Sequence, residues 1–193
     1  MRVARAAPLS PDARRASIVS ATLPLLRLYG RAVTTSQIAM AAGVAEGTLF
    51  RVFPDKDALI DAAITSAFDP KSSEAELARI DRSLDLRGKL VAAVEIMQQR
   101  VSHIWQLIAM LQLPAPAPTR TPATIDETGV RAQLALLFEP HRDELRVEPV
   151  QAARLLRALA FAGTHPRMTD QPLTPHEVVT LLLDGIRSRD EET

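Results

Sequence analysis

Cysteine is absent from these 193 residues, which excludes disulfide bonds and metal sites built on thiolates. Lysine occurs only three times, and aromatic residues make up 4% of the chain. No apolar run has the length that crosses a bilayer or the form of a signal peptide. Hydrophobic residues make up 47% of the chain, enough for one or two domains with a core. From the absence of cysteine and of long apolar runs we expect an intracellular, bacterial-type soluble protein of the cytoplasm.

Signatures of catalysis are missing as well. The sequence contains four histidines, His103, His141, His165 and His176. They form neither an HExxH motif nor any other paired spacing of metal ligands. The sequence has no glycine-rich phosphate loop and no nucleophile elbow. We therefore expect no enzyme activity, no metal and no cofactor.

Charge is unevenly distributed although the net charge is zero. Residues 1–60 contain eight Arg or Lys against four Asp or Glu, so the remainder carries the compensating negative charge. This asymmetry indicates that the first third meets a polyanion, although an arginine surplus also arises from a GC-rich genome.

Helix signals recur along the chain without persuasive strand alternation, so the predicted fold is all-α. Ser10 and Pro11 open a first helix that closes on Gly30, with a kink expected at Pro24. Capping boxes predict further helix starts, and they pair Thr34 with Gln37, Ser73 with Glu76, Thr124 with Glu127 and Thr174 with Glu177. Apolar residues repeat every three to four positions over 86–111 and predict a long central helix, whereas the prolines of 114–124 predict an extended connector.

The stretch from Thr34 to Val52 predicts a helix-turn-helix. One helix runs to about Ala42, Gly43 makes the turn because glycine enters the left-handed region without penalty, and a second helix follows from Val44. The outward residues of the second helix are small or polar and suit base edges in a major groove: Ala45, Glu46, Gly47, Thr48 and Arg51. The alternative is a solvated hairpin inside an ordinary bundle, which would need longer helices.

The segment TTSQIAMAAGVAEGTLFRVFPDKDALI resembles the DNA-binding signature of the TetR family of bacterial transcriptional repressors, over roughly residues 14 to 64. The resemblance implies an N-terminal three-helix helix-turn-helix domain followed by a helical-bundle regulatory domain. It also implies DNA contacts at Thr34, Thr35, Ser36, Ala45, Glu46, Gly47 and Thr48. Lys56 matches the lysine that opens the fourth helix of the family and binds a phosphate.

Two residues depart from the family pattern. Phe50, which we keep in the predicted interface, stands where the family usually has a tyrosine, and Val52 stands where it often has a histidine. Each departure removes a polar contact, so we expect Phe50 to pack against the backbone or the core. Affinity should then depend more on Arg51, on Lys56 and on the pair Arg14 and Arg15, although a solvated helix face explains that pair equally well.

The expected domains are residues 1–68, which bind DNA, and 69–193, which dimerise and bind an effector. Two amphipathic helices near the C-terminus predict a homodimer interface formed by Leu155, Leu159, Ala162, Val178, Leu182 and Ile186. The alternative is that these residues complete the core of a single chain.

An effector pocket is predicted on the long central helix, against the helix expected from Thr124 to Phe138. Apolar groups and a few hydrogen-bonding groups mix there, as ligand pockets require. The predicted lining is Met97, Gln98, Val101, Ser102, Trp105, Ala109, Met110 and Phe138. The competing interpretation is that Trp105 and the methionines simply fill the core.

Together these features predict a transcriptional repressor that binds a palindromic double-stranded DNA operator as a homodimer and is released by a small hydrophobic effector. The alternative is a helical small-molecule-binding or adaptor module that has lost DNA contact, and the residues at positions 50 and 52 support it.

Overall fold

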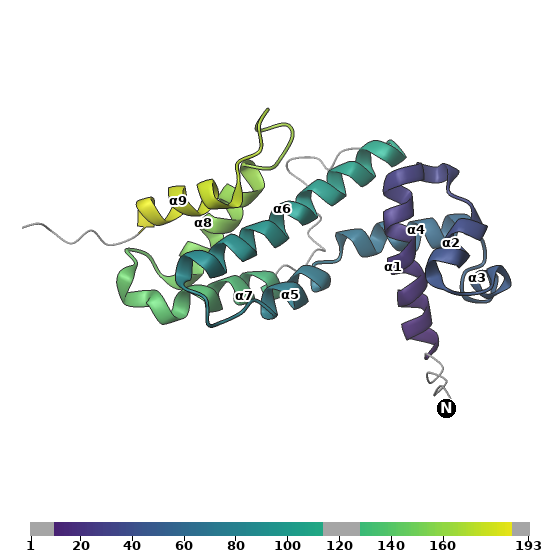
Figure 1. The fold of residues 1–193 in the computed structure, drawn as a ribbon, viewed down its shortest axis with the longest axis horizontal. Coiled ribbons are helices and arrows are strands. Elements are labelled where there is room, and N and C mark those ends of the chain that lie inside the picture. Colours follow the sequence, from purple (N-terminus) through teal and green to yellow (C-terminus); the bar gives the residue numbers. More distant parts are fainter. Residues whose placement is uncertain (1–9, 114–127, 187–193) are drawn as a thin grey trace, which may run out of the picture. The chain divides into compact units, whose positions relative to one another are not determined.

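The computed structural model describes residues 10–113 and 128–186, and every element within these ranges is a helix (Figure 1). The predicted all-α class, with an N-terminal helix-turn-helix and a helical bundle after it, is confirmed. The proline-rich connector and the capping box at Thr124 lie outside the described residues. None of the helices described is long and apolar enough to span a membrane.

The chain forms two compact units. Unit 1 comprises the described residues 10–68 and 106–113, and unit 2 comprises 69–105 and 128–186. The long helix α6 (Leu86–Leu111) therefore contributes most of its length to unit 2 and its last residues to unit 1. The sequence pattern indicated the helix but not this division.

Unit 1 contains α1 (Pro11–Tyr29), the 3-10 helix η1 (Gly30–Ala32), α2 (Thr35–Ala42), α3 (Glu46–Val52) and α4 (Lys56–Phe68). The Ser10 side chain caps α1 by accepting from the Ala13 amide at 3.2 Å, and α1 continues through Pro24. The core of the unit collects apolar residues from all these helices and from the end of α6: Ile18, Leu26, Ile38, Leu49, Phe53, Leu59, Ile60, Leu107 and Leu111.

The turn between α2 and α3 follows from local chemistry. Thr34 accepts from the Gln37 amide at 3.2 Å, and the Gln37 side chain accepts from the Thr34 amide at 2.8 Å, so the predicted capping box forms. Gly43 ends α2 with a φ of 65°, in the left-handed region that favours glycine. Helix α3 begins later than expected, at Glu46, because Ala45 is extended and serves as its N-cap residue.

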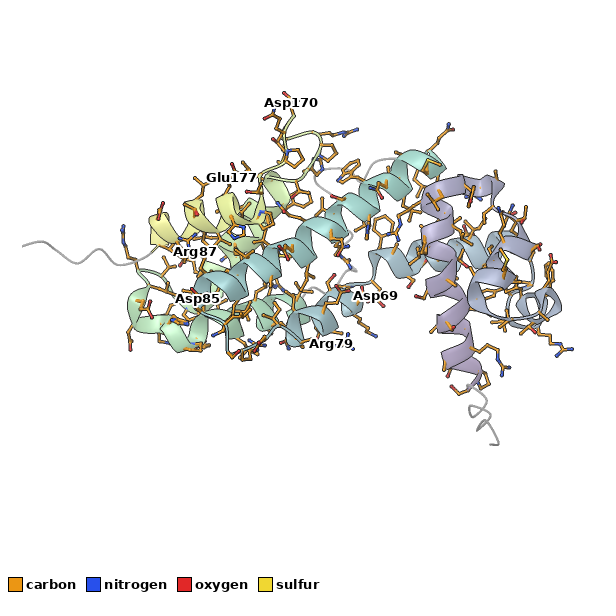
Figure 2. The ribbon with its side chains drawn as sticks, viewed as in Figure 1. Asp69, Arg79, Asp85, Arg87, Asp170 and Glu177 are labelled. Atoms are coloured by element: carbon orange, nitrogen blue, oxygen red, sulfur yellow. The ribbon has the colours of Figure 1, made fainter. Side chains whose placement is uncertain are left out.

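Unit 2 contains α5 (Lys71–Ala78), most of α6, α7 (Thr128–Phe138), the 3-10 helix η2 (Glu139–Glu144), α8 (Pro149–Ala162) and α9 (Pro175–Ile186). Helix α7 packs against α5 and α8, and α8 packs against α9 (Figure 1). Figure 2 shows Asp85 and Arg87 at the start of α6 and Glu177 at the start of α9. Arg87 donates to the Thr180 hydroxyl at 2.8 Å and so links α6 to α9.

Helix α5 starts before the residue that the capping-box pattern indicated. Ser73 was expected to cap it, but Ser73 is buried within the helix, which begins at Lys71. The Asp69 carboxylate accepts from the Lys71 amide at 3.0 Å and provides the early acceptor. The Arg100 side chain donates to the Asp69 carbonyl at 2.7 Å and to Ser73 at 3.4 Å, which explains why Ser73 faces inward.

Candidate nucleic-acid interface

The predicted DNA-contacting residues all lie on the outside of unit 1, on α2, α3 and the start of α4. Seven are exposed, namely Thr34, Ser36, Ala45, Glu46, Gly47, Phe50 and Arg51, and three are half-buried, namely Thr35, Thr48 and Lys56. The apolar residues between them, Ile38 and Leu49, are buried in the unit's core. The structure therefore gathers the ten residues on the surface of one unit, and their contact with DNA stays a prediction.

A side-chain hydrogen bond joins the first residues of α2 and α3. The Thr35 hydroxyl donates to the Glu46 carboxylate at Oε1. The two residues are eleven positions apart, across the turn, so no local sequence rule indicates the bond. It ties together the starts of the two helices on the face that carries the predicted DNA contacts.

Gly47 has no structural reason to be glycine within the described part of the chain. A Cβ added there would meet no described atom within 4 Å, and its φ is not in the left-handed region. Gly43 also has open space, but its φ of 65° requires glycine. Packing within the described chain therefore does not account for glycine at position 47, which leaves bare backbone on the outer face of α3.

Lys56 has a partner within the protein. Its ammonium donates to the Arg31 carbonyl at 2.8 Å, which joins the start of α4 to the end of η1. The Asp55 carboxylate accepts from the Ala58 amide at 2.7 Å and so caps the same helix start. An ammonium group has three donors, so Lys56 can bind an external anion while it keeps the Arg31 bond.

The expectation that Phe50 packs against the core is wrong, while its packing against the backbone stays a prediction. Its side chain is 51% exposed, while Leu49 and Phe53 occupy the buried positions on either side of it. Phe50 lies one helical turn after Glu46, so the two share a face of α3. The outer face of α3 therefore combines a carboxylate, an open glycine and an exposed ring.

A groove of about 630 Å³ lies between the start of α1 and helix α3. It is lined by Pro11, Asp12, Arg14, Arg15, Val44, Ala45, Thr48, Arg51 and Val52. Arg15 is fixed in place, since it donates to the Val52 carbonyl at 3.3 Å and its guanidinium lies 4.3 Å from the Phe53 ring centre. Three arginines against one aspartate make the groove basic, and only the fold brings α1 and α3 together to form it.

The predicted effector residues are distributed over both units, and their role in effector binding stays a prediction. Ala109 and Met110 belong to unit 1, whereas the other six belong to unit 2. Met97 and Phe138 are buried in the core of unit 2. The Trp105 ring meets His165, which follows α8, edge to face at 4.6 Å between ring centres. Burial, with the nearby Arg167 charge, lowers the pKa of His165.

Part of the predicted dimer interface is also corrected. Val178, Leu182 and Ile186 are buried in the chain's own core, so the stripe on α9 completes unit 2, as the alternative interpretation held. Leu155 is 38% exposed, and Leu159 and Ala162 are half-buried. The exposed apolar residue of α9 is Leu181, which the sequence pattern did not single out.

No group of three His, Asp or Glu residues in the described ranges is arranged to hold a metal ion.

Comparison with known proteins identifies the same region. The family described as bacterial regulatory proteins of the tetR family matches residues 18–63. A TetR transcriptional regulator from Streptomyces coelicolor shares the fold with a TM-score of 0.59 and 21% identity, over 91% of this chain and 99% of that one.

Two further solved structures share the fold as well. A structure that concerns control of antibiotic production by bacterial hormones has a TM-score of 0.55 and 20% identity, over 90% of this chain and 97% of the other. A complex of SmeT with triclosan has a TM-score of 0.52 and 19% identity, over 91% and 92% of the two chains. Residues 18–63 therefore match the helix-turn-helix domain of the tetR family of bacterial regulatory proteins, and the chain shares its fold with a solved TetR regulator over nine-tenths of its length.

Proposed function

We propose that the protein is a DNA-binding transcriptional repressor that binds a palindromic operator as a homodimer and is released by a small hydrophobic effector. The observation that carries this proposal is the outer face of α3, where Gly47 leaves open space that the chain's own packing does not use. Small and polar neighbours, Ala45 and Thr48, leave room for a base edge. One copy of α3 would read each half-site, with half-sites about 34–36 Å apart.

The basic groove supports the proposal through the DNA backbone. Arg14, Arg15 and Arg51 line it beside the reading face, and Arg15 is already ordered by Val52 and Phe53. An ordered guanidinium loses less conformational freedom when it binds a phosphate. Lys56, at the start of α4, would bind a second phosphate.

The proposed functions are divided between the two parts of the chain. We propose that residues 1–68 carry DNA binding and residues 69–193 carry dimerisation and effector binding, with the end of α6 packed into unit 1. The triclosan and hormone structures among the similar folds support a small-molecule effector for this chain. Within unit 2, Trp105 and its neighbours His165 and Phe161 offer a partly exposed aromatic surface for such a molecule.

A second candidate is an adaptor module that has kept the fold without DNA binding. Two observations favour it: Phe50 presents an apolar ring where the family usually has a tyrosine, and Lys56 already has a protein partner in Arg31.

The two candidates differ in a mobility-shift experiment with genomic fragments at two salt concentrations. The repressor should shift a small set of fragments and bind random DNA only at low salt, because counterion release makes non-specific binding strongly salt-dependent. An adaptor should shift none of them at either concentration. Loss of the shift on adding a hydrophobic compound would support effector release.

A further inference from the structure

Glu46 is an unexpected residue for a surface that meets DNA. It is the only acidic residue between Asp12 and Asp55, and it is exposed on the outer face of α3. A carboxylate next to phosphates is repelled, so it lowers affinity for every duplex alike. Glu46 lies in the first turn of α3, where a carboxylate stabilises the helix, and on this surface it can also accept a hydrogen bond from the bound partner.

Thr35 holds this carboxylate in one orientation. Its hydroxyl donates to Oε1, and no other hydrogen bond of Glu46 is found among the described residues. A carboxylate accepts about four hydrogen bonds over its two oxygens, so Oε2 remains as an acceptor. A side chain that is ordered before binding loses less entropy when it binds.

The neighbouring glycine allows the carboxylate to come close to its partner. Gly47 presents no side chain and has no described atom within 4 Å of where its Cβ would be. With glycine at position 47, the start of α3 can approach a groove floor more closely than it could with any residue that has a side chain there.

The chemistry of the major groove then selects one base. The exocyclic amino groups of cytosine and adenine are its hydrogen-bond donors, but adenine also presents the N7 acceptor beside its amino group. A carboxylate has only acceptors, so N7 repels it, while cytosine offers the amino group alone. We propose that Glu46, positioned by Thr35, accepts a hydrogen bond from the amino group of one cytosine in each half-site. This inference rests on the proposed DNA-binding function.

The test is selection of binding sites from a pool of randomised duplexes with the full-length chain. The wild-type protein should enrich cytosine at one position of each half-site by about tenfold or more. Glu46→Gln should lose that preference and enrich adenine there, because an amide has the donor that N7 requires. Thr35→Val should weaken the cytosine preference, because the Glu46 carboxylate loses the hydroxyl that orients it.

Asp61→Asn is the matched control, since it removes an exposed carboxylate from α4 of the same unit. It should leave every base preference as in the wild type. If Glu46→Gln selects the same sequences as the wild type and only its melting temperature changes, Glu46 is a brace between α2 and α3 and the inference is overturned. A wild-type protein that enriches sites without a cytosine preference also overturns it. If the wild type enriches no sequence at all, the proposed function itself fails.

Discussion

At the scale of single residues, a substitution at Gly47 should change protein stability and DNA affinity in opposite directions. Gly47→Ala should raise the free energy of unfolding of the free protein by about 0.5–1 kcal/mol, because alanine favours the helix and its Cβ enters open space. The same methyl group should weaken DNA binding if α3 approaches the groove there. Urea unfolding and fluorescence anisotropy on one preparation measure both effects.

Gly43→Ala is the control for the predicted changes in stability and DNA affinity. Its φ of 65° makes alanine strained, so that variant should lose stability. A Gly47→Ala protein that binds DNA as tightly as the wild type would contradict the close approach.

Lys56 tests the contact with the DNA backbone. Lys56→Gln should weaken binding to all duplexes alike and reduce the slope of log K against log salt by about one unit, because one phosphate contact is lost. Lys71→Gln removes a lysine from the start of α5 and should change neither quantity. If the slope of the Lys56 variant equals that of the wild type, Lys56 serves only to hold the Arg31 carbonyl.

Phe50 allows a gain-of-function test. Its exposed ring stands where the family usually has a tyrosine, so Phe50→Tyr should place a hydroxyl on the surface next to the DNA. A phosphate bond from that hydroxyl should raise affinity several-fold for operator and random DNA alike, since phosphate contacts carry no sequence information. Anisotropy titrations with both duplexes measure the affinity. An unchanged affinity would place the ring away from the DNA backbone.

At the scale of elements, the start of α9 provides a pH-dependent cap. The Thr174 amide and hydroxyl donate to the Glu177 carboxylate at 2.7 and 2.8 Å, and these bonds lower the pKa of Glu177. A lowered pKa means that the folded state binds a proton less readily than the unfolded state. The cap therefore contributes its full stability at neutral pH and loses it as the pH falls through the lowered pKa.

Glu177→Gln should consequently be less stable than the wild type at neutral pH and approach it in acid. Urea unfolding across this range measures the difference between the two proteins. Thr174→Ala removes the hydroxyl that donates to the Glu177 carboxylate and accepts from the Glu177 amide, and it should cost about 1 kcal/mol at neutral pH. A difference between Glu177→Gln and the wild type that does not change with pH would show that the charge is unimportant to the cap.

Local sequence rules predicted the elements well but not the contacts between them. The caps at Ser10, Thr34 and Thr174 and the turn at Gly43 follow from residues within four positions, and each of them forms. By contrast, the bonds of Thr35 to Glu46 and of Lys56 to Arg31 join separate helices. Side chains acquire such partners only when the helices pack, so no periodicity or spacing indicates them.

Because contacts between helices cannot be read from local patterns, the sequence also misassigned the buried stripe of α9 to the dimer interface. Apolar spacing identified the stripe of Val178, Leu182 and Ile186 but not which protein surface it meets. In the folded chain, α8 and its neighbours cover the stripe, and exposed Leu181 lies beside it. The candidate site was predictable as a surface of α2 and α3, while the basic groove needed the packing of α1 against α3.

At the scale of the whole molecule, the proposed homodimer depends on the residues that packing leaves exposed on α8 and α9. Leu155, Phe161 and Leu181 are 38%, 44% and 56% exposed, and Gly185 has open space around it. Gly185 lies one turn after Leu181, and a glycine there lets another helix approach closely. We expect exposed apolar residues on these two adjacent helices to provide the surface for a two-fold partner.

Charge on this surface should separate the two copies without unfolding them. Leu181→Arg should have the mass of one 21.1 kDa chain by light scattering, keep the wild-type helical signal and bind operator far more weakly, because a single half-site reader remains. Leu182→Arg should instead fail to fold, since it buries an unpaired charge in the core of unit 2. The matched control is Leu136→Arg, which changes a leucine of α7 that is 51% exposed, and this variant should remain dimeric. If Leu181→Arg keeps the dimer mass and Leu136→Arg does not, the two-fold contact lies on α7 instead.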